Sequence, residues 1–163
     1  MRASLPMLAA GLLAAATLTP APARAADISI TAGRSVTSGG RWTTSAFVNA
    51  GGKTYDWKGL HLQPVGTVGW VQGRDTPHDN LDHDVFVAGG GVRLANLWHR
   101  AFFSFQLGVA GGRTDALSSA GQFISTLGWQ GDHWVFMLRH ISNGRIFHGK
   151  NLGETMALVG VTF

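Results

Sequence analysis

Eight segments of about ten residues alternate between apolar and polar side chains, and clusters of Gly, Asn and Asp separate them. A period of two residues is typical of a β-strand with one apolar face. Beyond the first 25 residues, no segment has a sustained helical period or the length of a transmembrane helix. We therefore predict an all-β fold of eight antiparallel strands, at residues 27–36, 41–50, 59–73, 84–94, 100–112, 118–130, 133–142 and 154–163.

The alternation is clearest in the fifth segment, which has two chemically different faces. One face carries Ala101, Phe103, Phe105, Leu107 and Val109, and the other carries Phe102, Ser104, Gln106, Gly108 and Ala110. Two architectures use eight such strands. One is a soluble barrel or sandwich with its apolar side chains inside, and the other is a membrane barrel with its apolar side chains outside.

The first 25 residues have the features of a secretory signal peptide, and export favours the membrane barrel. Residues 8–18 form an apolar run too short to span a bilayer, and residues 23–25 (Ala-Arg-Ala) are a small-x-small cleavage pattern. We expect cleavage after residue 25, with residues 26–163 forming one domain. Without the two Arg of the leader, the formal net charge of +4 falls to +2. The remaining basic residues are scattered, so nucleic acid is not an expected partner.

Composition and the final residue favour the membrane barrel as well. Charged residues make up 13% of the chain, against about 25% in soluble domains. Small uncharged polar residues suit the narrow interior of an eight-stranded barrel. The last segment ends on Phe163, with Val161 and Val159 on the same face, which resembles the assembly signal of bacterial outer-membrane barrels. The predicted fold is an eight-stranded antiparallel transmembrane β-barrel of outer-membrane type.

The expected topology places both termini in the periplasm and the longer connections outside the cell. The short connections at residues 95–98 and 130–132 are then periplasmic, whereas residues 51–57 are long for a periplasmic turn. The external connection at residues 74–84 holds four Asp and two His. Carboxylates and imidazoles bind divalent cations, but a solvated polar loop is the preferred interpretation, and no metal site is predicted.

His140 and Ser142 carry the clearest chemistry in the chain. They are two residues apart near the end of the seventh strand, so they share a face and continue its outward-facing apolar row. A histidine is the usual base that activates a serine nucleophile, and a carboxylate normally fixes the tautomer of that histidine. Glu154 is the only Glu in the chain and begins the eighth strand. We expect the hairpin to bring Glu154 beside His140.

The stretch from Arg139 to Asn143, with Glu154 twelve residues after Ser142, resembles the active-site hairpin of the lipid A 3-O-deacylases (the PagL family). Those enzymes are eight-stranded outer-membrane barrels, and the specific part of the resemblance is the last 25 residues or so. It implies a serine esterase with His140 as general base, Ser142 as nucleophile and Glu154 as orienting acid. The implied reaction removes the ester-linked 3-hydroxyacyl chain at the 3-position of lipid A in lipopolysaccharide, without a cofactor. A homodimer is also implied.

The chain departs from the family at the position that helps to stabilise the oxyanion. The family has an Asn four residues before the Glu, whereas this chain has Lys150 there. Asn151, Asn143 and the backbone N–H of Gly144 are the alternative donors. An oxyanion donor contributes about 3 kcal/mol to transition-state stabilisation, so the replacement is expected to affect the rate.

The spacing between Glu154 and Phe163 is the second departure. These residues are nine positions apart, so they face opposite sides of a regular strand, whereas the family spacing is even. Either a β-bulge in the last strand or a loop position for Glu154 would resolve the conflict.

Basic residues surround the candidate site, and their type suits contacts with the lipid A phosphates. The candidates are Arg139, Arg145, His148 and Lys150. A generic basic rim attracted to anionic lipid is the alternative interpretation.

Two other functions of the protein also stay open. One is a non-enzymatic barrel that stabilises the membrane or mediates adhesion, and the other is a different lipid-modifying barrel, such as an acyltransferase or a phospholipase.

Overall fold

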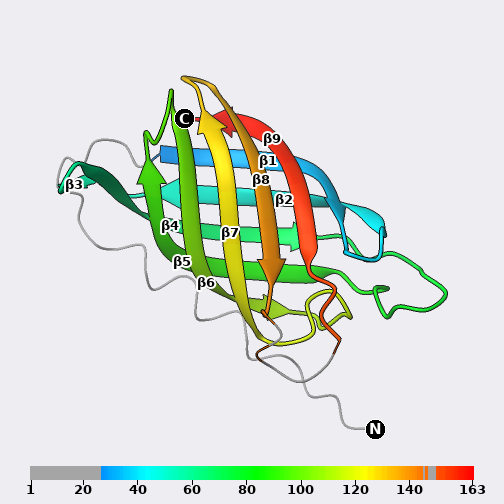
Figure 1. Cartoon of the computed structure of the whole chain (residues 1–163). Helices are drawn as coiled ribbons and strands as arrows, with labels where there is room; N and C mark the ends of the chain where they lie inside the picture. The colour runs from blue at the N-terminus through cyan, green and yellow to red at the C-terminus, as the bar shows by residue number, and fades with distance from the viewer. Residues whose placement is uncertain (1–26, 145, 147–149) are drawn as a thin grey trace, which may run out of the picture.

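The structure, a computed structural model, is a closed barrel of eight antiparallel strands (Figure 1) and describes residues 27–144, 146 and 150–163. The strands of the barrel are β1 (Asp27–Val36), β2 (Trp42–Gly51), β4 (Leu60–Val71), β5 (Val85–Ala95), β6 (Ala101–Gly111), β7 (Gly121–Gln130), β8 (Trp134–Ser142) and β9 (Glu154–Thr162). Each segment expected from the sequence matches one of these strands, which confirms the predicted eight-stranded antiparallel barrel. The expected signal peptide lies outside the described residues.

The barrel closes between its first and last strands. β1 pairs with β9 along eight residues, from Ser29 opposite Thr162 to Val36 opposite Thr155. On the other side β1 pairs with β2, and β2 pairs directly with β4. A short additional strand, β3 (Tyr55–Trp57), pairs only with the beginning of β4 and extends beyond the barrel wall (Figure 1). This small hairpin explains why the connection between β2 and β4 is longer than a turn.

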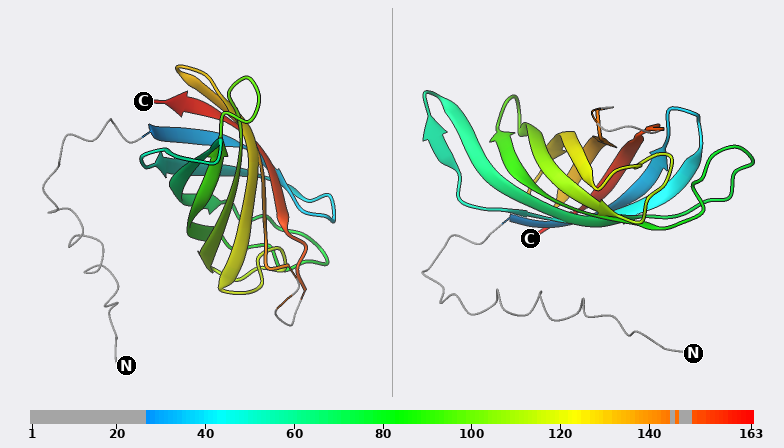
Figure 2. Two further views of the ribbon diagram at one scale, coloured as in Figure 1. Left: turned by 60° about the vertical axis from the view of Figure 1, so that its left-hand side comes forward. Right: turned by 90° about the horizontal axis from the view of Figure 1, so that it is seen from below.

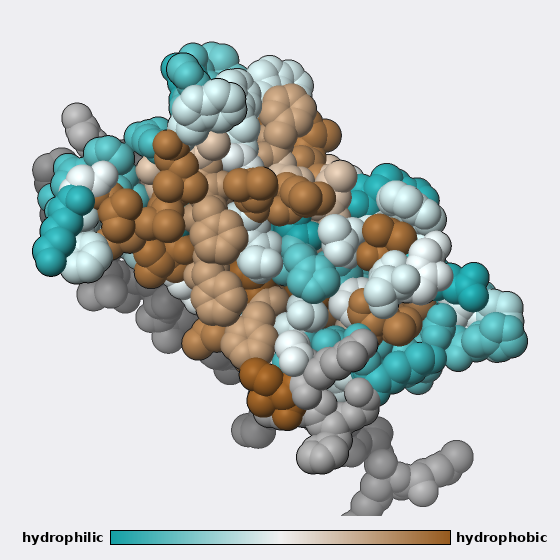
Figure 3. All heavy atoms as spheres, in the orientation of Figure 1, coloured by the Kyte–Doolittle hydropathy of each residue, from teal (hydrophilic) through white to brown (hydrophobic). Residues whose placement is uncertain are grey.

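The strand alternation places most of the large apolar side chains on the outer wall. In β6, Phe103, Phe105, Leu107 and Val109 are exposed, whereas Phe102, Ser104 and Gln106 are buried. Figure 3 shows the result as an apolar belt across the strands, with hydrophilic areas toward both ends of the barrel. Within the described residues, no helix is long and apolar enough to span a bilayer.

The barrel interior is filled and combines an apolar cluster with a polar network. The cluster includes Leu81, Leu117, Val71, Val85, Val87, Ile124, Ile141, Met156 and Leu158. In the network, Arg139 donates to Asn49 Oδ1 (2.7 Å) and Thr126 Oγ1 (3.0 Å). Most of the buried polar side chains are Ser, Thr, Gln and Asn, as expected, and they share the interior with this apolar cluster. An eight-stranded barrel has no open channel, so side chains of either kind must fill it.

Two glycines allow the closing strands to approach each other. A Cβ atom at Gly33 in β1 would lie 1.9 Å from the carbonyl oxygen of Ala157, and one at Gly160 in β9 would lie 1.9 Å from that of Ile30. Real Cβ atoms do not approach oxygen so closely. These two positions therefore require glycine for the β1–β9 pairing to form.

The two ends of the barrel differ in the length of their connections. At the end that we call the loop end lie the loops at residues 37–41, 72–84 and 112–120, together with the described residues of the connection between β8 and β9, which are 143–144, 146 and 150–153. At the other end, the turn end, lie the short connections at residues 96–100 and 131–133, together with β3. Backbone hydrogen bonds join the loops to one another, including Gly153 N–H to Ala116 O (3.0 Å) and Asp115 N–H to Asn80 O (2.8 Å). Figure 2 shows the strands curving between these two ends.

Candidate functional site

A short row of polar side chains interrupts the apolar outer wall near the loop end. His140 of β8 faces outward, directly opposite Ser125 of β7 and Thr155 of β9. Ser142 lies two residues further along β8, on the same face, and is paired with Phe123. His140 and Ser142 therefore share the outer face that the sequence predicted for them. Ser125 and Thr155 extend this polar row across three adjacent strands.

The ring of His140 is held on one side by the beginning of β9. Its Nδ1 atom lies 3.0 Å from Thr155 Oγ1, which is within hydrogen-bond distance. Gly153 supports the same ring, because a Cβ atom there would lie 2.9 Å from His140 Cε1, and its φ of +66° also favours glycine. Since Nδ1 already has a partner, Nε2 is the ring nitrogen that remains for proton transfer.

Ser142 lies between the polar row and an apolar surface. The ring of its strand partner Phe123 stacks with Phe105 at a centroid distance of 5.9 Å, and Ile146 is 67% exposed beside the site. In the part of the chain that the structure describes, no hydrogen bond joins His140 to Ser142. Alternate residues of a strand are about 7 Å apart at Cα. Catalytic hydrogen bonds are often long without substrate and tighten when it binds.

Glu154 is placed differently from our expectation, because it lies inside the barrel and not beside His140. Its side chain is 1% exposed. Oε1 accepts a hydrogen bond from Arg74 Nη2 at 2.6 Å, and Oε2 accepts one from the hydroxyl of Ser35. Both carboxylate oxygens are therefore occupied on the inner face of the wall.

Strand alternation explains this correction. β9 pairs continuously with β8 from Glu154 opposite Ile141 onward, so Glu154 is the first residue of a regular strand. Neither of the two ways that we considered for turning it outward, a β-bulge or a loop position, occurs. Successive residues of a strand point to opposite faces, and Thr155 therefore takes the place against His140 that the sequence suggested for Glu154.

The candidate oxyanion donors lie in the loop that follows β8, and their side chains are not gathered around Ser142. The Asn143 side chain is fully buried, and its Nδ2 donates to Ser118 Oγ at 3.2 Å. Gly144 adopts a left-handed turn with φ +62° and packs against the ring of Phe123. The Oδ1 atom of Asn151 is buried and has no hydrogen-bond partner among the residues that the structure describes. The structure thus turns the Asn143 amide inward, away from the outer wall.

Two of the candidate phosphate-binding residues have other partners in the structure. The Arg139 guanidinium is inside the barrel, 2% exposed, so it is not on the surface where a lipid phosphate would bind. Arg139 lies between the outward-facing Leu138 and His140 on β8, so strand alternation alone turns its side chain inward. Lys150 Nζ donates to Asp79 and to Asp115 Oδ2 (3.1 Å). Arg145 and His148 lie outside the described residues.

The contacts of Lys150 form an ionic clamp that we define by Lys150, Asp79, Asp115 and Arg41. Arg41 Nε lies 3.7 Å from Asp79 Oδ2, so the clamp joins four loops at the loop end. The hydrogen bond from Lys150 lowers the pKa of Asp79 below its usual value of 3.8. The same contact, followed by the one with Asp115, raises the pKa of Lys150.

These pKa shifts predict that the ionic clamp opens only well below neutral pH. Because the folded pKa of Asp79 is lowered, its contribution to loop stability is fully present above pH 3.8 and is lost as the pH falls through the lower folded value. We expect the NMR signals of loop amides such as Leu152 to stay constant from pH 7 to pH 5 and to move below about pH 4. Lys150→Met should remove most of this acid response. Loosening already at pH 5, or an unchanged response in the variant, would contradict the assignment.

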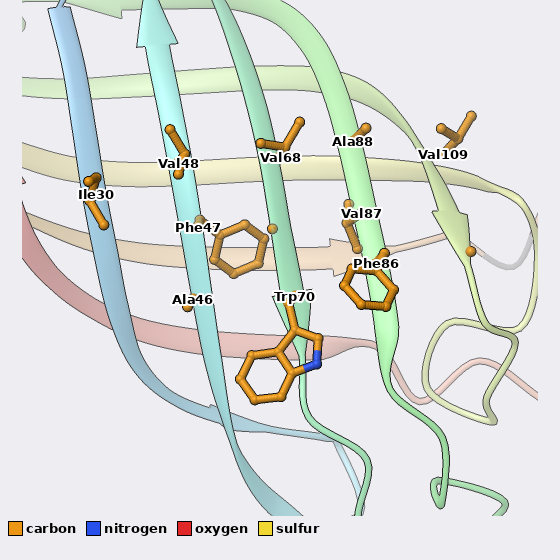
Figure 4. Close-up of a pocket in the computed structure, with 12 residues that line it drawn as sticks. Ile30, Ala46, Phe47, Val48, Val68, Trp70, Phe86, Val87, Ala88 and Val109 are labelled. Carbon is orange, nitrogen blue, oxygen red and sulfur yellow. The ribbon is translucent and has the colours of Figure 1, made fainter. Parts of the chain in front are cut away.

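An apolar hollow on the outer wall is separate from this polar row. It has a volume of about 520 Å³ and lies over β1, β2, β4, β5 and β6, where Trp70 and Phe86 project into it (Figure 4). No residue that lines it has a titratable side chain.

In the loop at residues 72–84, the Asp and His side chains do not converge: within the described residues, no group of three potential metal ligands is found. The polar row therefore remains the best candidate for chemistry.

Sequence reasoning missed two participants in this site, Thr155 and Arg74. Thr155 could have been found by counting back from Phe163, since both residues have the outward parity of β9. Arg74 carries no comparable signal, because only the folded loop brings it to Glu154.

Comparisons of the chain with protein-family models, with curated proteins and with solved structures find no match.

Proposed function

We propose that the protein is an outer-membrane lipid A 3-O-deacylase, a serine esterase with His140 as general base and Ser142 as nucleophile. The observation that carries the proposal is the row of Ser125, His140 and Thr155, with Ser142 beside it, on an otherwise apolar outer wall. Polar groups that face lipid are costly and tend to mark functional sites. The spacing of His140, Ser142 and Glu154 also resembles the deacylase hairpin.

The outer wall supports a membrane location. Its exposed apolar belt is bounded by polar ends, as the lipid-facing surface of a membrane barrel should be. Exposed Trp side chains at or next to strand ends suit the aromatic girdles of such barrels; they are Trp42, Trp57, Trp98 and Trp134. The contrast between long loops at one end and shorter connections at the other fits an extracellular loop end.

The position of the polar row supports a lipid substrate with its ester near the headgroup. His140 and Ser142 lie close to the loop end, which this orientation places at the outer leaflet where lipopolysaccharide resides. Phe123 and Phe105 provide an apolar surface next to Ser142 for an acyl chain. The ester bond would then meet the nucleophile at the boundary between the acyl chains and the sugar.

The mechanism uses the two ring nitrogens of His140 differently. In this mechanism Nδ1, which lies 3.0 Å from Thr155 Oγ1, carries the ring proton, and Nε2 accepts the Ser142 proton while Ser142 Oγ attacks the ester carbonyl. His140 then gives that proton to the departing sugar oxygen, which leaves an acyl-Ser142 intermediate. Water attacks this ester while His140 takes its proton, and His140 then returns the proton to Ser142 Oγ as the 3-hydroxy fatty acid is released. A threonine hydroxyl stabilises the imidazolium less than a carboxylate does, so we expect a modest turnover.

The direct test is mass spectrometry of lipid A from cells that express the wild type or Ser142→Ala. We expect the wild type to release one 3-hydroxyacyl chain and the variant to release none, since only Ser142 supplies the attacking oxygen. Loss of the chain with both proteins would exclude Ser142 as the nucleophile. No loss with either, repeated with purified protein on lipid A in detergent, would reject the esterase.

The same analysis separates the other lipid-modifying functions. An acyltransferase would transfer the chain to a second lipid, so no free 3-hydroxy fatty acid would appear in water. A phospholipase would cleave glycerophospholipid instead of lipid A, and a dependence on calcium would favour it. An acyltransferase would leave the same lipid A product as the esterase, so the two are separated by whether the chain is found as a free fatty acid or on a second lipid.

A further inference from the structure

We infer that Arg74 and Glu154 form a buried ion pair that positions His140 through the two residues on either side of Glu154. Glu154 then acts from inside the barrel as a positioning residue and does not touch His140. The catalytic consequence rests on the proposed function, whereas the effect on the His140 ring can be measured without any substrate.

The ion pair joins a loop to the first residue of β9. Arg74, in the loop at residues 72–84, has a side chain that is 12% exposed, and its Nη2 donates to Glu154 Oε1 at 2.6 Å. The loop is held in place where Arg74 N–H donates to Leu81 O at 2.7 Å, and Leu81 is itself 1% exposed. Ser35 of β1 occupies the other carboxylate oxygen. Glu154 is therefore fixed from two directions.

Both chain neighbours of Glu154 contact the His140 ring on the opposite side of the wall. Thr155 Oγ1 lies 3.0 Å from Nδ1, and Gly153 packs against Cε1. Because strand residues alternate between faces, an inward Glu154 requires an outward Thr155. The backbone N–H of Gly153 also donates to Ala116 O at 3.0 Å, which secures the residue before Glu154. Any shift of Glu154 would therefore move both contacts of the imidazole.

The proposed mechanism requires the His140 tautomer in which Nδ1 carries the proton and donates it to Thr155 Oγ1. A general base at Nε2 requires the neutral ring to carry its proton on Nδ1, and the hydrogen bond made by one ring nitrogen decides the protonation of the other. A neutral imidazole in water favours the opposite tautomer, with the proton on Nε2. A Thr155 hydroxyl held against Nδ1 as an acceptor would therefore favour the tautomer in which His140 can act as a base.

The test compares Arg74→Met with the matched control Arg41→Met, using the full barrel in detergent micelles. Arg41 is also a cation of the loop end, but it contacts Asp79 and not Glu154. The first measurement is the 15N spectrum of the His140 side chain, which distinguishes the two tautomers. We expect Arg74→Met to shift the population from the Nδ1–H form toward the Nε2–H form, and Arg41→Met to leave it unchanged. Arg74→Lys, which retains the charge, should restore part of the wild-type signal.

The second measurement is turnover of a lipid ester. We expect Arg74→Met to lower kcat about tenfold with KM within twofold, because the substrate contacts remain while the base is misplaced. If Arg74→Met fails to fold, the double variant Arg74→Met/Glu154→Gln removes both buried charges and should fold with the same shifted tautomer. A folded variant with a wild-type tautomer would overturn the inference. If Arg74→Met shifts the tautomer of His140 but the wild-type protein itself has no esterase activity, the positioning role is supported and only the proposed function is rejected.

Discussion

Replacing His140 by Asn is expected to lower kcat/KM for a lipid ester by about 10³-fold. An Asn side chain reaches roughly as far as Nδ1 of the imidazole, so its contact with Thr155 Oγ1 can be kept. It has no counterpart of Nε2 and cannot take the Ser142 proton. The loss should therefore fall on kcat, since the apolar surface beside Ser142 that holds the acyl chain is unchanged.

The effect of His140→Asn is checked by steady-state kinetics of the purified barrel in detergent. His133→Asn is the matched control, because His133 is exposed at the turn end, far along β8 from the site. The double variant His140→Asn/Ser142→Ala should be no less active than the worse single variant, since the two residues act as one unit. Two results would reject His140 as the general base. One is a double variant whose loss of activity is the sum of the two single losses, and the other is a His140→Asn variant with more than a tenth of the wild-type activity.

Replacing Gly160 by Ala is expected to destabilise the barrel by about 3 kcal/mol, at the upper end of the cost of overpacking. The added Cβ would lie 1.9 Å from the carbonyl oxygen of Ile30 and 2.7 Å from the Cα of Thr31. These are backbone atoms of β1, so no side chain can rotate away. Relief requires β9 to separate from β1, and that opens the pairing that closes the barrel and exposes two strand edges.

The stability change is measured by urea unfolding of the refolded barrel in micelles, followed by tryptophan fluorescence. Gly111→Ala provides the control, because a Cβ at Gly111 meets no atom within 4 Å. That substitution should be close to neutral or slightly stabilising, since it reduces the freedom of the unfolded chain. Equal unfolding midpoints for the two variants would show that the closing strands tolerate a methyl group at Gly160.

The alternating segments were enough to predict the eight strands of the barrel, their approximate limits and which face of each strand is apolar. These properties depend on a period of two residues within single segments, as in β6 with outward Phe105 and inward Gln106. The outward direction of His140 and Ser142 followed from the same local rule. Counting parity back from Phe163 also indicated that Glu154 would face inward unless β9 were irregular.

The side chains that meet across the barrel could be identified only in the folded protein. Arg74 and Glu154 are 80 residues apart, Ser35 and Glu154 are 119 apart, and Arg139 reaches Asn49 across 90. Lys150 likewise finds Asp79 and Asp115 only after three loops fold over one end. Such contacts depend on barrel closure and on the paths of loops. No short-range sequence pattern indicates either of them. For that reason the His140–Ser142 pair could be placed in advance and Thr155 could have been found from strand parity, whereas Arg74, which reaches Glu154 only through its folded loop, could not.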